Sequence, residues 1–218
     1  MRQTITAADD LPQNPQAPQD REPALVVRVG SPAALLRLVP HLLGFMPEAS
    51  LVVIGTEAPH DRIKVTLRYD LPDPPGAGVS ADIAAHAVGV IGSQRLATLV
   101  AVGYGPGSLV DPVAGALDAA ARTAGIDVLD ILRVEDGRYW SCFCADRDCC
   151  PAAGTPFDPA AAHSAAAVLA SAGNRVLADR AAVAARVAPL GGLAAESMRQ
   201  ATRRANASSS NSVCPCFV

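Results

Sequence analysis

Cysteine is the residue type in this chain best suited to chemistry, and four of the six cysteines lie close together in the sequence. Cys144, Cys149 and Cys150 form a Cys-x₄-Cys-Cys pattern, and Cys142 precedes them by two residues. Thiolates of this kind bind zinc. Neighbouring thiols also support redox chemistry, or pack as small apolar side chains. We keep three interpretations of Cys144, Cys149 and Cys150: a zinc site, a redox site, or a structural corner that closes a turn against Trp140.

The spacing of these cysteines does not choose between the three interpretations. Zinc sites commonly use two short Cys-x₂₋₄-Cys pairs, whereas this segment offers one x₄ spacing and two adjacent cysteines. A redox motif of the thioredoxin type needs Cys-x-x-Cys before a helix, and the sequence has none. Zinc is therefore the one cofactor that the sequence suggests. Further ligands are available elsewhere, and the sequence selects none of them: His60, His86, His163, Cys214 and Cys216.

A glycine-rich loop that follows an apolar segment is the second candidate site. Its candidate ligand-binding residues are Gly103, Gly105, Gly107 and Ser108, because glycine lets the backbone approach a phosphate closely. The third glycine comes one residue too early for the G-x-G-x-x-G motif, and no lysine follows as in a P-loop. Pro106 also removes an N–H donor. We therefore expect a turn between a strand and a helix, with nucleotide or phosphate binding as the alternative.

Three short motifs stand out from the rest of the chain, and the match that they support covers roughly residues 25–189. The first is Ser31-Pro32 leading to Leu42-Leu43-Gly44-Phe45, with Pro47 and Ser50–Val53. The second is Gly137–Ser141 with Cys144, Cys149-Cys150-Pro151 and Gly154-Thr155, and the third is Asp179-Arg180-Ala181. This combination resembles a family of actinobacterial proteins, the domain of unknown function DUF4192. The resemblance implies a mixed α/β fold in an intracellular bacterial protein, and it implies no activity. Members usually have an aromatic residue in place of Cys142, so the resemblance does not include Cys142 in a shared site.

The composition excludes several classes of protein. A formal charge of −3 and an aromatic content of 4% are unlike a basic nucleic-acid-binding domain, so we do not expect a nucleic-acid partner. No apolar run approaches the roughly 18 residues that span a bilayer, and residues 1–22 lack the apolar run of a signal peptide. We therefore expect a cytoplasmic protein without a membrane partner.

No complete catalytic motif is present, since the sequence contains neither G-x-S-x-G nor H-E-x-x-H. We assign no catalytic residues and expect a non-catalytic binding or interaction module with a structural cysteine corner. Its partner would be a protein or a small molecule. The alternatives are a zinc- or thiol-dependent site at the three cysteines, and a nucleotide or phosphate ligand at the glycine-rich loop.

The pattern of apolar residues predicts a mixed sheet with helices packed on it. Asp136-Gly137 separates two strand patterns and predicts an antiparallel hairpin. The expected strands are Ala24–Val29, Ser50–Ile54, Arg62–Tyr69, Ala97–Val102, Val128–Val134 and Arg138–Phe143. Polar residues followed by proline predict helix starts at Ser31-Pro32, Asp111-Pro112 and Asp158-Pro159. The first of these helices is expected to restart at Pro40 and to end at Gly44, and another is expected from Ser80 to Ile91.

Four segments follow from this pattern. Residues 1–22 form a disordered tail, residues 23–157 a mixed α/β domain, residues 158–206 a three-helix segment, and residues 207–218 a flexible tail. The three alanine-rich helices are expected at Pro159–Ala172, Val176–Val187 and Leu193–Ala205. Two interpretations of the three-helix segment stay open: a further layer on the α/β domain, or part of a truncated helical domain, since family members usually continue beyond Val218.

Overall fold

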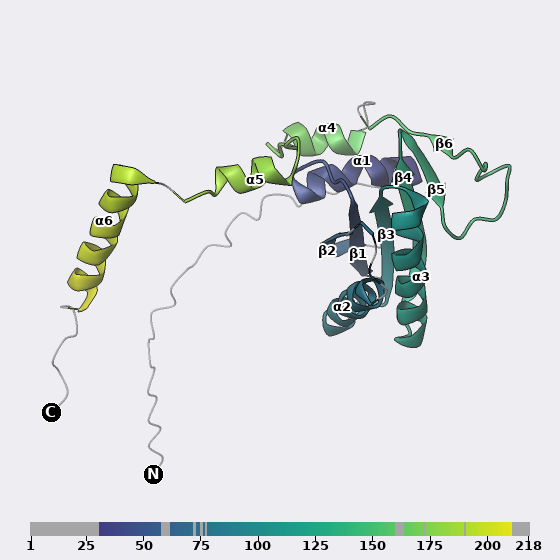
Figure 1. Ribbon diagram of the computed structural model, residues 1–218, viewed down its shortest axis with the longest axis horizontal. Helices are drawn as coiled ribbons and strands as arrows, with labels where there is room; N and C mark the ends of the chain where they lie inside the picture. Colours follow the sequence, from purple (N-terminus) through teal and green to yellow (C-terminus); the bar gives the residue numbers. More distant parts are fainter. Residues whose placement is uncertain are drawn as a thin grey trace, which may run out of the picture.

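A mixed six-stranded sheet lies between helices in the computed structural model (Figure 1). The structure describes residues 31–57, 62–71, 73–74, 76, 78–159, 164–171, 173–189 and 191–210. The strands follow the order β2-β1-β3-β4-β5-β6 across the sheet. Only β3 and β4 are parallel, and the other four pairs are antiparallel. The bounds are β1 (Ser50–Glu57), β2 (Arg62–Asp70), β3 (Thr98–Tyr104), β4 (Asp127–Glu135), β5 (Arg138–Ser141) and β6 (Thr155–Pro156).

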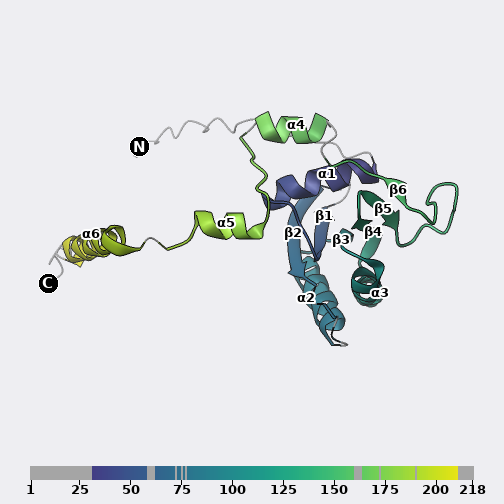
Figure 2. The ribbon, with the colours of Figure 1, turned by 45° about the horizontal axis from the view of Figure 1, so that its top comes forward.

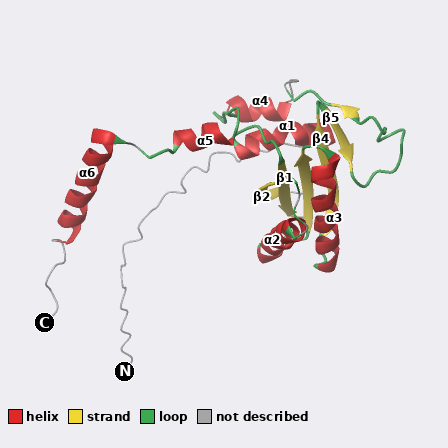
Figure 3. Ribbon diagram, in the orientation of Figure 1, coloured by secondary structure: helices red, strands yellow, loops and turns green. Residues whose placement is uncertain are grey.

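Helices cover both faces of this sheet, so the expected mixed α/β fold is confirmed (Figure 3). α1 (Pro32–Leu43) packs on one face, and α2 (Val79–Ser93) and α3 (Gly107–Thr123) pack side by side on the other. α4 (Ser164–Ser171) contacts α1, and α5 (Arg180–Arg186) and α6 (Gly192–Ser210) follow. Both views show α6 well away from the sheet (Figures 1 and 2). Within the described residues, no helix is long and apolar enough to span a membrane.

The sheet separates the hydrophobic core into two clusters, one on each face. Strands β1 and β3 contribute buried side chains to both clusters. Leu51 and Val53 of β1 pack against α2 and α3. Their neighbours Val52 and Ile54 point the opposite way and pack against α1. A strand between two helix layers requires apolar residues at successive positions, which is the pattern from Leu51 to Ile54.

The first helix begins and ends as its sequence predicts. The Ser31 hydroxyl accepts a hydrogen bond from the N–H of Ala34 at 3.2 Å, and Gly44 has a φ of 80°, the left-handed conformation that glycine adopts at no steric cost. The expected restart at Pro40 is wrong, because α1 continues through that residue. Burial of the preceding turn, with Leu36 and Val39 almost fully enclosed, holds the helix together where one N–H is missing.

Three other helix starts also differ from expectation. α3 begins at Gly107, not at the expected Asp111-Pro112 cap. The start of α3 is determined by burial, since Leu109 and Val110 must already be helical to pack into the core. Asp158 and Pro159 are not helical, and the residues from 160 to 163 lie outside the described part. α2 begins at Val79, one residue before the expected cap.

The last part of the chain differs more from expectation. Residues 176–178 were expected to be helical, but Leu177 forms a β-bridge with Phe45 and α5 begins only after Asp179. The Asp179 carboxylate accepts a hydrogen bond from the N–H of Ala182 at 2.7 Å, which caps the helix. Arg180 pairs with Asp70 of β2 at 2.6 Å. The segment from Leu177 to Arg180 therefore contacts the α/β unit through the β-bridge and the ion pair. The expected strand Ala24–Val29 lies outside the described residues.

The Asp136-Gly137 hairpin is confirmed. Both residues have positive φ angles, 46° and 69°, as the two central residues of a type I′ turn require. Glu135 pairs with Arg138 directly across the turn. β5 ends at Ser141 rather than at the expected Phe143, because the chain turns away there into the long loop, residues 142–154, that leads to β6.

Candidate metal centre

The loop between β5 and β6 brings three cysteine sulfurs together. The Sγ atoms of Cys144, Cys149 and Cys150 all lie within 4.8 Å of one another. In a tetrahedral zinc site with Zn–S bonds of about 2.3 Å, the sulfurs are about 3.8 Å apart, so small side-chain rotations bring these three into bonding range. None of the three is buried, and Cys149 is exposed. The structural-corner interpretation, which requires buried cysteines, is therefore not supported by their environment.

Ser141 fixes the point where the loop leaves the sheet. Its hydroxyl donates a hydrogen bond to Asp130 Oδ1 of β4 at 2.7 Å. The same oxygen accepts bonds from the backbone N–H groups of Phe143 at 3.3 Å and Cys144 at 3.2 Å. These contacts hold the backbone of the first cysteine of the cluster against the neighbouring strand.

A tight turn centred on Asp146 returns the chain to Cys144. The N–H of Cys150 donates to the carbonyl of Asp146 at 2.7 Å, and the N–H of Asp148 donates to Asp146 Oδ1 at 2.9 Å. This turn closes the x₄ spacing of the motif. It explains how a pattern that departs from the usual zinc spacing still places the three sulfurs together.

Trp140 and Arg138 hold the returning end of the loop. Trp140 Nε1 donates to the carbonyl of Ala152 at 3.1 Å, and Arg138 donates to the carbonyls of Ala153 and Gly154 at 3.1 and 3.0 Å. Gly154 has a φ of 76° and lies against the Trp140 ring. Both ends of the loop are thus attached to β5, and the cysteines lie between them.

Two thiols of the cluster, those of Cys144 and Cys150, have pKa values that are shifted in opposite directions. The pKa of Cys144 is lowered because the thiol of Cys150 donates a hydrogen bond to its thiolate. The same interaction raises the pKa of Cys150 to about 12. The thiolate form of Cys144 is therefore favoured, and Cys150 keeps its proton at neutral pH.

Cys142 lies outside the cluster. Its N–H donates to the carbonyl of Ile131 at 2.8 Å and extends the pairing between β4 and β5. Burial, together with the carboxylates of Asp111 and Asp130, raises the pKa of Cys142 to about 11. Its thiol is accordingly protonated at neutral pH, and its sulfur is not one of the three that lie together.

Of the possible further ligands named from the sequence, the structure describes His86, which is not part of the cluster. Nδ1 of His86, which belongs to α2, is hydrogen-bonded to the hydroxyl of Tyr69 in β2 at 2.8 Å. His60, His163, Cys214 and Cys216 lie outside the described residues. Among the residues that the structure describes, the cluster therefore consists of the three cysteines alone.

The glycines of the second candidate site have packing and backbone roles that need no ligand. A Cβ at Gly103 would overlap the Val110 side chain of α3, and one at Gly107 would overlap the Arg133 guanidinium. Gly105 has a φ of 139°, and its N–H donates to the carbonyl of Val134 at 2.9 Å. Ser108 is exposed within α3. The loop is the turn between β3 and α3.

Sequence reasoning did not identify Ser141 and Asp130 as contributors to the site. Replacing Ser141 with alanine should lower zinc affinity about tenfold to a hundredfold, the range found when partners that orient metal ligands are removed. A competition titration against a coloured chelator measures this. Ser93→Ala is the matched control, since the Ser93 hydroxyl donates to the carbonyl of Val90 within its own helix, α2. Equal affinities for the two variants would contradict a positioning role for Ser141.

Comparison with known proteins identifies one family. The family model described as a domain of unknown function, DUF4192, matches residues 32–213. This range contains the sheet, all six helices and the cysteine loop. No curated protein and no solved structure matches the chain significantly.

Proposed function

The chain belongs to the DUF4192 family, and from that premise we propose that it is a zinc-binding protein whose Cys144, Cys149 and Cys150 hold one ion as thiolates. The observation that carries the proposal is the separation of the three Sγ atoms, all within 4.8 Å of one another on an accessible loop. The sequence-based expectation of a binding module rather than an enzyme is retained.

The role of the residues follows from their places in the loop. Cys144 would hold the ion as a thiolate, the form that the hydrogen bond from Cys150 already favours. Cys149 and Cys150 approach from the Asp146 turn, and Ser141 anchors the other side. Bound zinc supplies a cross-link between the two arms of the loop and compensates the charge of the thiolates. Three protein ligands leave one of the four tetrahedral positions for another group.

The proposal needs reduced thiols, which the cytoplasm maintains; we propose that compartment as well. Because the thiols must lose their protons to bind zinc, and the pKa of Cys150 is raised to about 12, zinc competes with protons. Zinc affinity should therefore rise with pH and fall as the pH is lowered.

Titration of the metal-free protein with Co²⁺ tests the proposed ligand set. We expect a sulfur-to-cobalt charge-transfer band that saturates at about one equivalent, because Co²⁺ occupies zinc thiolate sites and reports sulfur ligation. Cys142→Ser should give the same band, since Cys142 lies outside the cluster. A titration without a charge-transfer band would refute the proposal.

A thiol redox site is the second candidate, favoured by the thiolate–thiol pair of Cys144 and Cys150. In this reaction hydrogen peroxide would be reduced to two waters while the two thiols become a disulfide, with their two protons transferred to the waters. Peroxide treatment of the metal-free protein, followed by mass spectrometry, tests this. A rapid loss of two mass units favours the redox function; slow oxidation, equal to that of the unfolded chain, favours the zinc function.

A further inference from the structure

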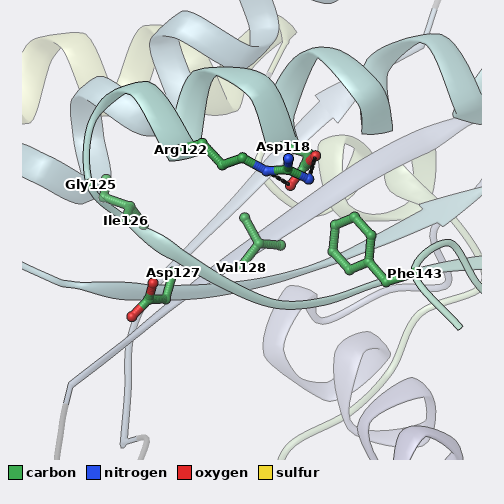
Figure 4. A pocket seen from close by; sticks show the side chains of 7 residues that line it. All are labelled: Asp118, Arg122, Gly125, Ile126, Asp127, Val128 and Phe143. Carbon is green, nitrogen blue, oxygen red and sulfur yellow. Dashed lines mark hydrogen bonds and ion pairs between the residues drawn. The ribbon is translucent and has the colours of Figure 1, made fainter.

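A groove lies between α3 and the strands β4 and β5, and its lining does not include Cys144, Cys149 or Cys150. It consists of two adjoining cavities of about 420 and 380 Å³, which share Asp118 and Phe143. Figure 4 shows the first cavity, with Asp118 and Arg122 pointing from α3 towards Val128 of β4 and the ring of Phe143 at one end. The second cavity continues past Gly115 to Trp140.

The groove exists because the sheet is wider than the helix layer that covers it. On this face α2 and α3 pack over β1 to β4, and the described residues place no helix over β5. The floor of the groove includes Ile131 and Trp140, and Phe143 is 45% exposed beside it. Phe143 is thus an exposed aromatic side chain at a part of the sheet that no described helix covers.

Acidic side chains line the groove. Asp111 and Asp118 stand on α3, and Asp127 begins β4. Of the two basic residues, Arg122 is paired with Asp118 at 2.5 Å, and the Arg133 guanidinium is stacked on Trp140 at 4.2 Å. Asp111 and Asp127 have no ion pair among the described residues. The groove therefore favours a partner that is apolar in the middle and basic at its sides.

α6 has the complementary character. Met198, 59% exposed, is the centre of an apolar stripe, with three alanines at helical spacing: Ala194, Ala201 and Ala205. The rest of the helix carries three arginines and one glutamate: Arg199, Arg203, Arg204 and Glu196. A single helix of this length is marginally stable in water without tertiary packing, yet α6 lies apart from the sheet and its helices (Figures 1 and 2).

We propose that α6 of one copy of the chain docks in the α3 groove of a second copy. The stripe from Ala194 to Ala205 and the groove wall from Asp111 to Arg122 are both about 17 Å long at 1.5 Å per residue. Small residues on both sides, Gly115 of α3 and Ala201 of α6, allow the two helices to approach closely. Because each copy carries both surfaces, reciprocal docking closes a two-fold dimer.

Blocking the groove tests the proposal without risk to the fold. A Cβ at Gly115 meets nothing within 4 Å, so Gly115→Arg places bulk and positive charge in open space within a helix. We expect its dimer dissociation constant, measured by sedimentation equilibrium, to rise at least about tenfold. Gly115→Ala should still form dimers, and the zinc content of both variants should match that of the wild type.

α6 provides the reciprocal variant. Met198→Glu introduces a negative charge in the centre of the stripe, whereas Gln200→Glu introduces the same charge on the opposite side of the helix. Only Met198→Glu should weaken the dimer. A wild-type chain that stays monomeric at high concentration, or a dimer that neither Gly115→Arg nor Met198→Glu weakens, would overturn the proposal.

Mixing the two variants identifies the interface directly. In the mixture, α6 of the Gly115→Arg chain can still enter the intact groove of the Met198→Glu chain. We expect a heterodimer, detected with one chain carrying a fluorescent label, that is weaker than the wild-type dimer and stronger than either variant alone. No association on mixing would show that the two surfaces do not contact each other.

Discussion

Replacing Cys150 with serine should lower the zinc affinity of the protein about a hundredfold to a thousandfold. A structural zinc site with four ligands contributes about 10–16 kcal/mol, or roughly 2.5–4 kcal/mol per ligand. The serine hydroxyl remains protonated at neutral pH and does not replace a thiolate. The Sγ of Cys150 belongs to the cluster of three, and its N–H bond to Asp146 is retained in the variant, so the loss reports the sulfur.

The affinity is measured by competition with a coloured chelator under reducing conditions. Cys142→Ser is the control, because it makes the same chemical change two residues before Cys144 and outside the cluster. The control should bind zinc as the wild type does. If Cys150→Ser binds as tightly as Cys142→Ser, the cluster is not the zinc site.

Replacing Gly154 with alanine should cost about 2–5 kcal/mol of the free energy of unfolding. A φ of 76° costs a residue with a Cβ about 1–2 kcal/mol. In addition, the new Cβ would lie 2.5 Å from Cε2 of Trp140, and overpacking of this kind adds about 1–3 kcal/mol. The ring cannot move freely, because its Nε1 is bonded to Ala152.

Gly125→Ala separates the cost of the positive φ from the cost of overpacking against Trp140. Gly125 has a similar φ of 69°, and nothing lies within 4 Å of a Cβ there, so only the backbone cost of about 1–2 kcal/mol remains. Urea unfolding of both variants measures the difference. Equal losses in the two would contradict the close packing of the cysteine loop on Trp140.

Local sequence patterns predicted the parts of the fold that local chemistry determines. Ser31-Pro32 and Gly44 bound α1, and Asp136-Gly137 turns β4 into β5, because caps and tight turns depend on a few adjacent residues. The Asp111-Pro112 pair failed as a helix start. Whether a helix begins at a cap depends on which residues the core must bury, and here Val110 must pack on Gly103.

The sequence predicted the residues of the candidate site but not their arrangement. The three cysteines were identified from their residue type and clustering, but their separation depends on how the loop is folded. That fold relies on Asp130, eleven residues before Ser141, and on Trp140 beneath the returning arm. The α3 groove was not predictable from any motif, because it arises where the sheet extends beyond its helix layer.

The most direct test of the zinc site is the X-ray absorption spectrum of the full chain, purified under reducing conditions without chelator and accompanied by metal analysis. We expect about one zinc per chain, with three sulfur neighbours at about 2.3 Å. A protein that holds no zinc, or holds it with oxygen and nitrogen neighbours only, would contradict the assignment of Cys144, Cys149 and Cys150 as the metal centre.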